Sequence, residues 1–301
     1  MSEDLLLKLE VLRVLSQRRE MELQELAREL GVTEEYARGI LGELSKYFII
    51  KVSESSVSWS TSDNLGWLKP WGWSYYYRII MGSSMTSARW LPPWSIVVSE
   101  LQSQGKGRHG KTWISNLGGL WVTFKIHAKP QTTQLLPMIV PVVLVRVLRD
   151  KLSVNSEVKW PNDIVYKNGK IAGILLEGEY AGADIIGYIG VGMNVNNDPP
   201  IETAVSLRGI KGELVPRGRL LSYLTGWMGR LDKLSEKPDE LRREYMEYLS
   251  TLGRRVTALT VSGEVKGVAK DITELGELVV ENERGSYKLT SSEVLRLIHV
   301  E

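Results

Sequence analysis

The pattern of apolar and polar positions over residues 1–63 changes from helical to strand-like. Two helical stripes come first, and Gly31 stops the first helix while Thr33 caps the second. Residues 48–61 then alternate as a short two-stranded hairpin does. This order predicts a winged helix-turn-helix domain over residues 1–64. The apolar positions of the two stripes are Leu23, Leu26, Ala27 and Leu30, then Tyr36, Ile40, Leu41 and Leu44.

The charge of this segment bears on what the domain binds. Residues 1–63 carry eight Lys or Arg and twelve Asp or Glu side chains, which is a net charge of −4. Contacts with phosphate supply most of the non-specific affinity for DNA, and the second helix opens with Glu34 and Glu35, where base contacts are made in such domains. The layout favours DNA binding and the charge favours a regulatory or interaction module, so both interpretations stay open.

Residues 65–252 combine short strands with a few helices. A stretch rich in Gly, Pro and Trp at residues 63–76 predicts a linker into this domain. Asn168-Gly169 lies between two alternating runs, which is a strong signal for a two-residue hairpin turn. Short hairpin-linked strands with few helices predict an α+β domain whose sheet is largely antiparallel. Strands are expected at residues 75–80, 95–100 and 120–126, and an apolar helix at residues 132–152.

Residues 253–301 show strands separated by turns at regular intervals. The turns fall at "SGE", "ELGE" and "ERGS". This spacing predicts a small β-barrel of about fifty residues. The chain as a whole is therefore expected to be an α+β protein of several domains.

Composition narrows the chemistry. The 301 residues are 43% hydrophobic and 25% charged, as in ordinary globular proteins, and the net charge is only +2. There is no cysteine, and the three histidines, His109, His127 and His299, are far apart in the sequence. These counts argue against disulfides, thiolate or zinc sites and a Ser-His-Asp triad. The acidic N-terminus and the interrupted apolar run at residues 135–148 predict neither a signal peptide nor a membrane span, so we expect a cytoplasmic protein.

The stretch "GKGRHGKT" at residues 105–112 fits the phosphate-binding P-loop pattern G-x-x-x-x-G-K-[ST]. A P-loop requires a helix directly after it, because the helix N-terminus completes the phosphate cradle. Here Asn116, Gly118 and Gly119 follow within two turns, and a strand pattern comes next. We therefore expect a different kind of loop.

Several blocks in order resemble the biotin protein ligase family. These are "GSSMTSAR" at residues 82–89, the glycine-rich loop, "KWPND" at 159–163, "KIAGILLEGE" at 170–179 and "GVGMNVNN" at 190–197. The C-terminal "GVAKDITELGELVVE" resembles the family's SH3-like barrel, and the N-terminal pattern resembles the bifunctional type that also represses the biotin operon. The resemblance implies a class II synthetase-like catalytic domain over residues 65–252 and an SH3-like domain over residues 253–301.

The implied reaction has two steps. Biotin and MgATP give biotinyl-5′-AMP and pyrophosphate, and the biotinyl group then passes to a lysine of a biotin carboxyl-carrier domain. Two anions must be brought together, so fixed cations and oriented amides are sufficient and no enzyme nucleophile is needed. The resemblance also implies a homodimer, operator DNA as a further partner, and no membrane partner.

The resemblance assigns biotin contacts to the first half of the catalytic domain. Arg108 is expected to hold the acyl phosphate, because a guanidinium suits bidentate phosphate contact. Lys106 and His109 stand where the family usually has Arg, and Met85 where it often has Asn, so the loop is less basic than is usual. The implied biotin-binding residues are Ser83, Ser84, Met85, Gln102, Lys106, Gly107, Arg108 and Lys159.

Lys159 is the main catalytic candidate beside Arg108. Strand alternation places Lys159 on one face with Glu157, opposite Val158 and Trp160. It would bridge the biotin carboxylate and the α-phosphate of ATP. Asp163 is a candidate Mg²⁺ ligand, with capping of a turn as the alternative. The implied ATP or adenylate contacts are Gly105, Lys106, Arg108, Gly110, Trp113 and Asn194.

The composition of the loop further predicts that it is mobile when empty and closes over the adenylate, because glycine gives it backbone freedom. Two other functions stay open at this point. One is a lipoate or octanoate ligase or transferase with a related catalytic domain. The other is a transcription regulator that binds biotinyl-AMP without ligating it.

Overall fold

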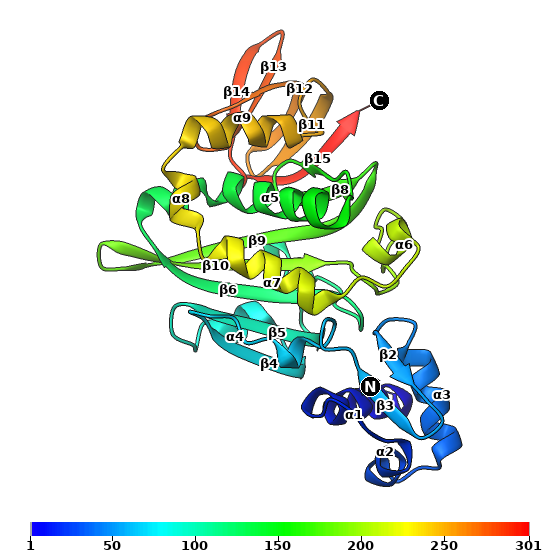
Figure 1. The fold of residues 1–301 in the computed structure, drawn as a ribbon. Coiled ribbons are helices and arrows are strands. Elements are labelled where there is room, and N and C mark those ends of the chain that lie inside the picture. Colours follow the sequence, from blue (N-terminus) through cyan, green and yellow to red (C-terminus); the bar gives the residue numbers. More distant parts are fainter. Residues whose placement is uncertain (1, 301) are drawn as a thin grey trace.

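The computed structural model describes residues 2–300. Figure 1 shows three parts, with the N-terminal helices at one end, a large central sheet with its helices, and the C-terminal strands at the other end. The α+β architecture with mostly antiparallel sheets agrees with the expectation from the sequence.

The N-terminal part packs three helices on a small sheet. Gly31 adopts the left-handed conformation that ends α2, and the Thr33 side chain accepts from the backbone N–H of Tyr36, so both predicted helix boundaries are confirmed. Tyr36 was expected in the buried stripe, but it is 53% exposed and Ala37 is buried in its place. The elements are α1 (Glu3–Gln17), α2 (Leu23–Leu30), α3 (Glu34–Leu44), β1 (Met21–Glu22), β2 (Ile50–Val52) and β3 (Ser56–Trp59), in the sheet order β1-β3-β2.

The central sheet has seven strands in the order β4-β5-β6-β10-β9-β8-β7. All neighbouring strands are antiparallel except β4 and β5, which are parallel. Their bounds are β4 (Ser74–Met81), β5 (Ser95–Gln102), β6 (Leu120–Ala128), β7 (Glu157–Lys159), β8 (Asp163–Tyr166), β9 (Gly169–Ala181) and β10 (Asp184–Met193). The strands predicted at residues 75–80, 95–100 and 120–126 are β4, β5 and β6, and the predicted hairpin joins β8 to β9.

Helices cover the two faces of the sheet unequally. Alternation along β5 sends Ile96 and Val98 into the main core with the long helix α5 (Pro130–Leu152), whereas Val97 packs with the short helix α4 (Ser84–Ala88) on the other face. No helix between residues 2 and 300 is long and apolar enough to cross a membrane. The remaining helical elements are η1 (Leu65–Trp67), η2 (Arg108–Gly110), α6 (Leu207–Lys211), α7 (Arg217–Met228), α8 (Leu231–Ser235) and α9 (Pro238–Tyr248).

The hairpin between β8 and β9 turns one residue earlier than predicted. Tyr166 pairs with Gly169, so Lys167 and Asn168 form the turn, and Lys167 has a φ of 55°. Gly169 opens β9 because a Cβ there would lie 2.5 Å from the side chain of Val205. Packing against residues 203–205 therefore decides the position of the turn.

The C-terminal strands form a five-stranded antiparallel sheet in the order β14-β13-β12-β11-β15. Within residues 2–300, the edge strands β14 and β15 do not pair with each other, so the predicted barrel is not closed by a continuous ladder. The bounds are β11 (Arg255–Thr260), β12 (Gly263–Ile272), β13 (Leu278–Asn282), β14 (Gly285–Leu289) and β15 (Val294–Val300). Trp160 joins this sheet to the central one by donating from Nε1 to the carbonyl oxygen of Gly276 at 3.0 Å.

A buried ionic cluster joins the N-terminal part to the central sheet. Arg217 on α7 is fully buried and pairs with Asp63 at 3.0 Å and with Glu100 on β5 at 2.5 Å. Asp63 also accepts from Trp59 Nε1 at 2.8 Å. Tyr77 donates to Glu100 at 2.8 Å. Burial raises the pKa of Glu100, and the Arg217 guanidinium opposes that effect. The residues at the predicted boundary near residue 64 are therefore a buried junction rather than a free linker.

Replacing Arg217 by methionine leaves two buried carboxylates without a cation. We expect the free energy of unfolding to fall by about 3–5 kcal/mol at pH 8. Without the opposing guanidinium, burial raises the pKa of Glu100 further above its unfolded value, so the loss shrinks as the pH falls toward 5 and this carboxyl binds a proton. Urea titrations at both pH values measure this, with the exposed Arg219→Met on the same helix as control. A deficit that grows at low pH would contradict the assignment.

Candidate active site

A cavity of about 450 Å³ lies where the central sheet, the loop after β5 and strand β15 meet. Its lining comes from segments far apart in the chain, including α4, β7, β9, β10 and the C-terminal sheet. Of the residues predicted from the sequence, all line this cavity except Gly105 and Gly110. The residues that it brings together are Ser83, Ser84, Met85, Gln102, Lys106, Gly107, Arg108, Trp113, Lys159, Asp163 and Asn194.

One end of the cavity is built from small hydroxyl side chains and one amide. The Gln102 side-chain oxygen accepts from the backbone N–H of Ser84 at 2.6 Å, and its Nε2 donates to Ser115 at 2.8 Å. The hydroxyl of Thr123 donates to Ser84 Oγ at 2.8 Å. The buried Ser83 hydroxyl has no partner within residues 2–300. These hydrogen bonds hold the turn in place and leave the Ser83 hydroxyl free to bond a ligand. The turn therefore suits the binding of a neutral polar ring.

Met85 lies in the floor of this end. It is 4% exposed, and a Cβ on Gly190 would lie 2.8 Å from its sulfur. The thioether therefore fills the space above a strand glycine. Met85 can therefore give a ligand only apolar contact, and it lacks the hydrogen bonds that the family's usual Asn would supply.

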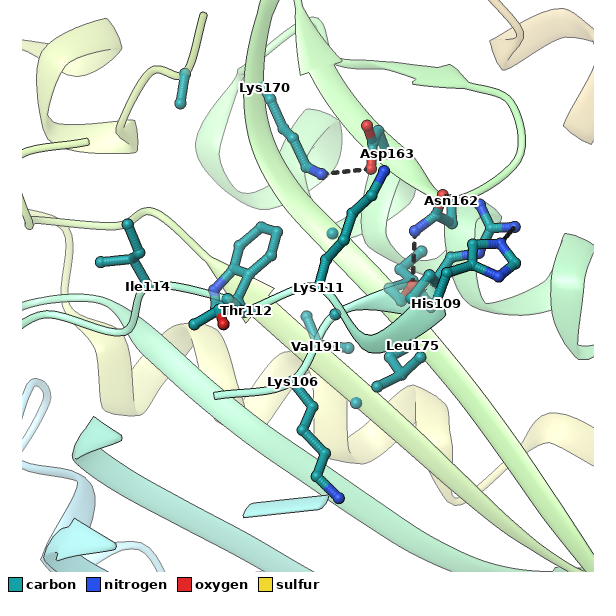
Figure 2. A pocket seen from close by; sticks show the side chains of 18 of the residues that line it. Lys106, His109, Lys111, Thr112, Ile114, Asn162, Asp163, Lys170, Leu175 and Val191 are labelled. Carbon is teal, nitrogen blue, oxygen red and sulfur yellow. Dashed lines mark hydrogen bonds and ion pairs between the residues drawn. The ribbon is translucent and has the colours of Figure 1, made fainter. Parts of the chain in front are cut away.

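The glycine-rich loop owes its path to two glycines, Gly105 and Gly110. A Cβ on Gly105 would lie 2.3 Å from the carbonyl oxygen of Trp113, so only glycine fits at the base of the loop. Gly110 has a φ of 72° at the exposed tip. Both residues shape the loop and do not line the cavity, in contrast to the adenylate contact expected from the sequence. Figure 2 shows Lys106 pointing away from His109 and Lys111, so the basic side chains of the loop are divided between two directions.

Arg108 turns toward the C-terminal sheet. Its guanidinium donates to Asn162 Oδ1 and to the carbonyl oxygen of Val294, both at 3.0 Å, and to the carbonyl oxygen of Ser291. His109 Nε2 lies 3.1 Å from the same Val294 oxygen. Burial lowers the pKa of Arg108, and Asp163 opposes that effect. The loop is thus held against the C-terminal strands by main-chain acceptors, which a competing anion could replace.

Lys159 ends β7 and lines the cavity. Val158 and Trp160 on either side are buried, so the predicted alternation of this strand is confirmed. Burial, and then the charges of Lys159 and Arg254, lower the pKa of His299 to about 4. His299 is therefore neutral near pH 7, and Lys159 supplies the charge at this point of the cavity.

Trp113 lies across two glycines of neighbouring strands. Gly192 pairs with Gly173, and a Cβ on either residue would lie within 2.6 Å of the indole. The Trp113 Nε1 is buried and has no partner within residues 2–300. Lys170 Nζ lies 4.9 Å from the ring centroid. Trp113 covers Gly192, and Met85 covers Gly190 two residues earlier on β10, so the two side chains follow one another along this strand. The indole offers a flat surface for a purine base, and we call this part of the cavity the nucleotide end.

Gly192→Ala is expected to displace Trp113, because the strand backbone cannot move away from the added methyl. The affinity for ATP, the nucleotide implied by the resemblance, should fall about tenfold, the value of one lost stacking contact. Calorimetric titration of ATP measures it. Gly226→Ala is the matched control, since a Cβ there meets open space. Unchanged ATP affinity would show that Trp113 does not form the nucleotide end.

Asp163 pairs with Lys170 at 2.6 Å, and Figure 2 shows the two side chains meeting at the cavity wall. No group of three or more His, Cys, Asp or Glu side chains that could hold a metal ion occurs over residues 2–300. An Mg²⁺ ion would thus have Asp163 as its protein ligand and would depend on phosphate oxygens for the rest of its coordination. The residues fit an ion that arrives with a nucleotide.

Asn194 is buried in the turn after β10. Its side-chain oxygen accepts from Asn197 Nδ2 at 2.9 Å, and its backbone N–H donates to Ile171 at 2.8 Å. It borders the cavity close to the Trp113 end, as expected for a residue near a base.

The cavity lining also includes charged and amide side chains that the sequence did not single out, among them Lys170, Asn162 and Arg296. Lys170 begins the "KIAGILLEGE" block, and Asn162 belongs to "KWPND", so both stood in motifs that carried the resemblance. Arg296 lies on β15 in another domain, and no motif marks it.

The P-loop interpretation is excluded by the backbone. The residues after Gly110 form no α-helix before β6 begins at Leu120. Lys111 donates to the carbonyl oxygen of Leu295 at 3.4 Å, so it does not sit in a ring of amides.

Comparison with known families agrees with the site. Residues 80–194 match the Biotin/lipoate A/B protein ligase family, and residues 251–297 match the Biotin protein ligase C terminal domain. Together the two matches cover more than half of the chain. The chain belongs to the biotin protein ligase family. It is an enzyme of the ligase class.

Known proteins resemble the chain over most of its length. It is 27% identical to the bifunctional ligase/repressor BirA of Bacillus subtilis, over 81% of this chain and 79% of that protein. It is 27% identical to the biotin–[acetyl-CoA-carboxylase] ligase of Paracoccus denitrificans, over 66% of this chain and 88% of that one. The fold is similar to that of the biotin protein ligase from Aquifex aeolicus in complex with biotin and ATP, with a TM-score of 0.66, 24% identity and coverage of 75% and 99% of the two chains.

Proposed function

We propose that the protein joins biotin to ATP, forming biotinyl-5′-AMP and pyrophosphate, and transfers the biotinyl group to a lysine of a biotin carboxyl-carrier domain. One observation carries the proposal. Lys159, Arg108 and Lys170 line a single cavity, which also contains the unpartnered Ser83 hydroxyl and the Trp113 indole. Cations for the phosphate, a free hydroxyl for a polar ring and a flat indole for a purine are the groups that an acyl-adenylate requires.

The arrangement suits the first step because both reactants are anions. A carboxylate oxygen attacks the α-phosphate, and pyrophosphate leaves with the electron pair of the broken P–O bond. Lys159 is placed to neutralise the two reacting groups, and Arg108 to hold the phosphate once its carbonyl partners release it. In the second step, the amine of the carrier lysine attacks the acyl carbon and AMP leaves. Mg²⁺, held by the phosphates and Asp163, supplies further charge neutralisation when bound.

An exchange assay tests the proposal against its nearest rival. Incorporation of labelled pyrophosphate into ATP is measured with biotin, lipoate or octanoate as the only acid. We expect exchange with biotin alone. Exchange with lipoate or octanoate instead would assign the chain to the other branch of the family, and binding of biotinyl-AMP without any exchange would indicate a regulator that no longer ligates.

A role as a biotin-dependent repressor is a second candidate. The α2–α3 layout and the name of the Bacillus subtilis relative favour it. The surface of α3 weighs against it. Glu34 and Glu35 are exposed there, and both would repel DNA phosphates. Arg38 donates to the carbonyl oxygens of Ser53 and Glu54, so its guanidinium is already engaged within the protein. A mobility-shift assay on the protein's own upstream region, with and without biotin and ATP, decides between a repressor and an internal module.

A further inference from the structure

The segment that follows β10 forms one wall of the cavity. Pro200, Ile201 and Ala204 line it, and Ala204 forms a β-bridge with Lys170, whose Nζ lies 4.9 Å from the centroid of the Trp113 ring. Residues 198–205 contain no helix or strand. Two backbone hydrogen bonds tie the segment to β9, from Lys170 N–H to the carbonyl oxygen of Thr203 at 2.9 Å and from Val205 N–H to that of Lys170 at 3.0 Å. The position of this segment therefore affects the backbone of Lys170 and the width of the nucleotide end.

The N-terminal part holds the start of the same segment. The Tyr47 hydroxyl, just beyond α3, donates to Asp198 Oδ2 at 2.8 Å. Asp198 Oδ1 accepts from Arg208 Nη2 at 2.5 Å. The same guanidinium lies 5.3 Å from the centroid of the Tyr47 ring and donates from Nη1 to the carbonyl oxygen of Lys46. The four residues form a closed ring of contacts between two domains.

Packing supports the polar ring. A Cβ on Gly118 would lie 2.9 Å from Tyr47 Cβ, so the tyrosine sits directly on this glycine. The carbonyl oxygen of Gly118 accepts from the backbone N–H of Asn196 at 2.9 Å. Arg208 N–H in turn donates to the carbonyl oxygen of Val195 at 2.8 Å. Tyr47 thus contacts Gly118 and Arg208, and each of these residues is hydrogen-bonded to the turn that leads from β10 into the cavity wall.

We propose that Tyr47 and Arg208 are positioning residues that hold residues 198–205 against the nucleotide end of the cavity, so the N-terminal part is a working component of the ATP site. The inference rests on the proposed function for the identity of the nucleotide. Because the contacts link two sites, binding of nucleotide must also stabilise the N-terminal contacts by the same free energy. This ring of contacts is partly exposed to solvent, so we expect its loss to have a moderate effect on the affinity for nucleotide.

Tyr47→Phe tests the proposal with little disturbance. The aromatic side chain keeps its contacts with Arg208 and Gly118, and only the hydrogen bond to Asp198 is lost. We expect the KM for ATP in the exchange assay to rise about three- to tenfold, which is the value of one ordinary hydrogen bond, because the exposed Asp198 carboxylate is screened by solvent. The kcat and the KM for biotin should stay within twofold. Arg208→Met should act in the same direction and more strongly, since it removes three of the contacts.

Tyr36→Phe, which removes an exposed hydroxyl from α3, is the matched control and should leave all three constants unchanged. An unchanged KM for ATP in both Tyr47→Phe and Arg208→Met would overturn the proposal, as would an equal rise in the KM for biotin, which indicates general damage. If the wild-type enzyme shows no biotin-dependent exchange, the proposed function fails on its own. Calorimetric titration of ATP into wild-type and Tyr47→Phe protein then still tests the positioning role, and equal affinities would refute it.

Discussion

Replacement of Lys159 by alanine is expected to remove nearly all biotin-dependent ATP–pyrophosphate exchange. Lys159 lies on a short strand between Val158 and Trp160, which are both buried. Packing of these two side chains fixes the face of the strand on which Lys159 lies, so no neighbouring side chain can replace it. Lys159 lines the cavity, and the proposed function assigns its charge to the point where the carboxylate and the α-phosphate meet. Loss of one fixed charge that stabilises a transition state costs about a hundredfold to a thousandfold in rate.

The control for this variant is Lys270→Ala. Lys270 is an exposed lysine on β12 that does not line the cavity. The rate of exchange should be unchanged in the control, and both variants should unfold at the wild-type urea concentration. Normal exchange by Lys159→Ala would remove Lys159 from the catalytic assignment.

Arg108→Ala is expected to leave adenylate synthesis partly intact and to release biotinyl-AMP. In the structure, Arg108 ties the glycine-rich loop to main-chain oxygens of Ser291 and Val294. The proposed function requires Arg108 to exchange these acceptors for the phosphate as the loop closes. Without the guanidinium, the closed loop loses a charge-assisted contact, and the mixed anhydride meets water. We expect dissociation of biotinyl-AMP to become about ten- to a hundredfold faster, measured as the rate of release from pre-formed complex.

Lys111→Ala separates this account from the P-loop pattern. Lys111 would be the phosphate ligand of a P-loop, but here it contacts the carbonyl oxygen of Leu295. Release of the adenylate should change less than threefold in this variant. If Lys111→Ala releases the intermediate faster than Arg108→Ala does, the roles assigned within the loop are wrong.

Much of the fold was predictable because local patterns determined it. Gly31 and Thr33 mark helix boundaries by their own backbone and side-chain chemistry, and the alternation around Lys159 follows from two large apolar neighbours. The residues of the site that lie in motifs, such as Ser83 and Lys159, also line one cavity.

The rest depended on contacts between distant segments. Arg217 reads as one more helix arginine, and only the fold brings Asp63 and Glu100 to it. Arg296 and Val294, a main-chain acceptor of Arg108, belong to a separate sheet. Tyr36 was misplaced because a helical stripe does not state which of two adjacent positions faces the core, and here the small Ala37 does.

The central claim is tested most directly by transfer of labelled biotin to a carboxylase carrier domain. The wild-type protein is incubated with the carrier domain and labelled biotin, with ATP and without it, and a carrier whose acceptor lysine is replaced by arginine serves as control. The account predicts label on the intact carrier only when ATP is present and none on the control carrier. Labelling without ATP, or no labelling of the intact carrier although biotin-dependent exchange proceeds, would contradict it.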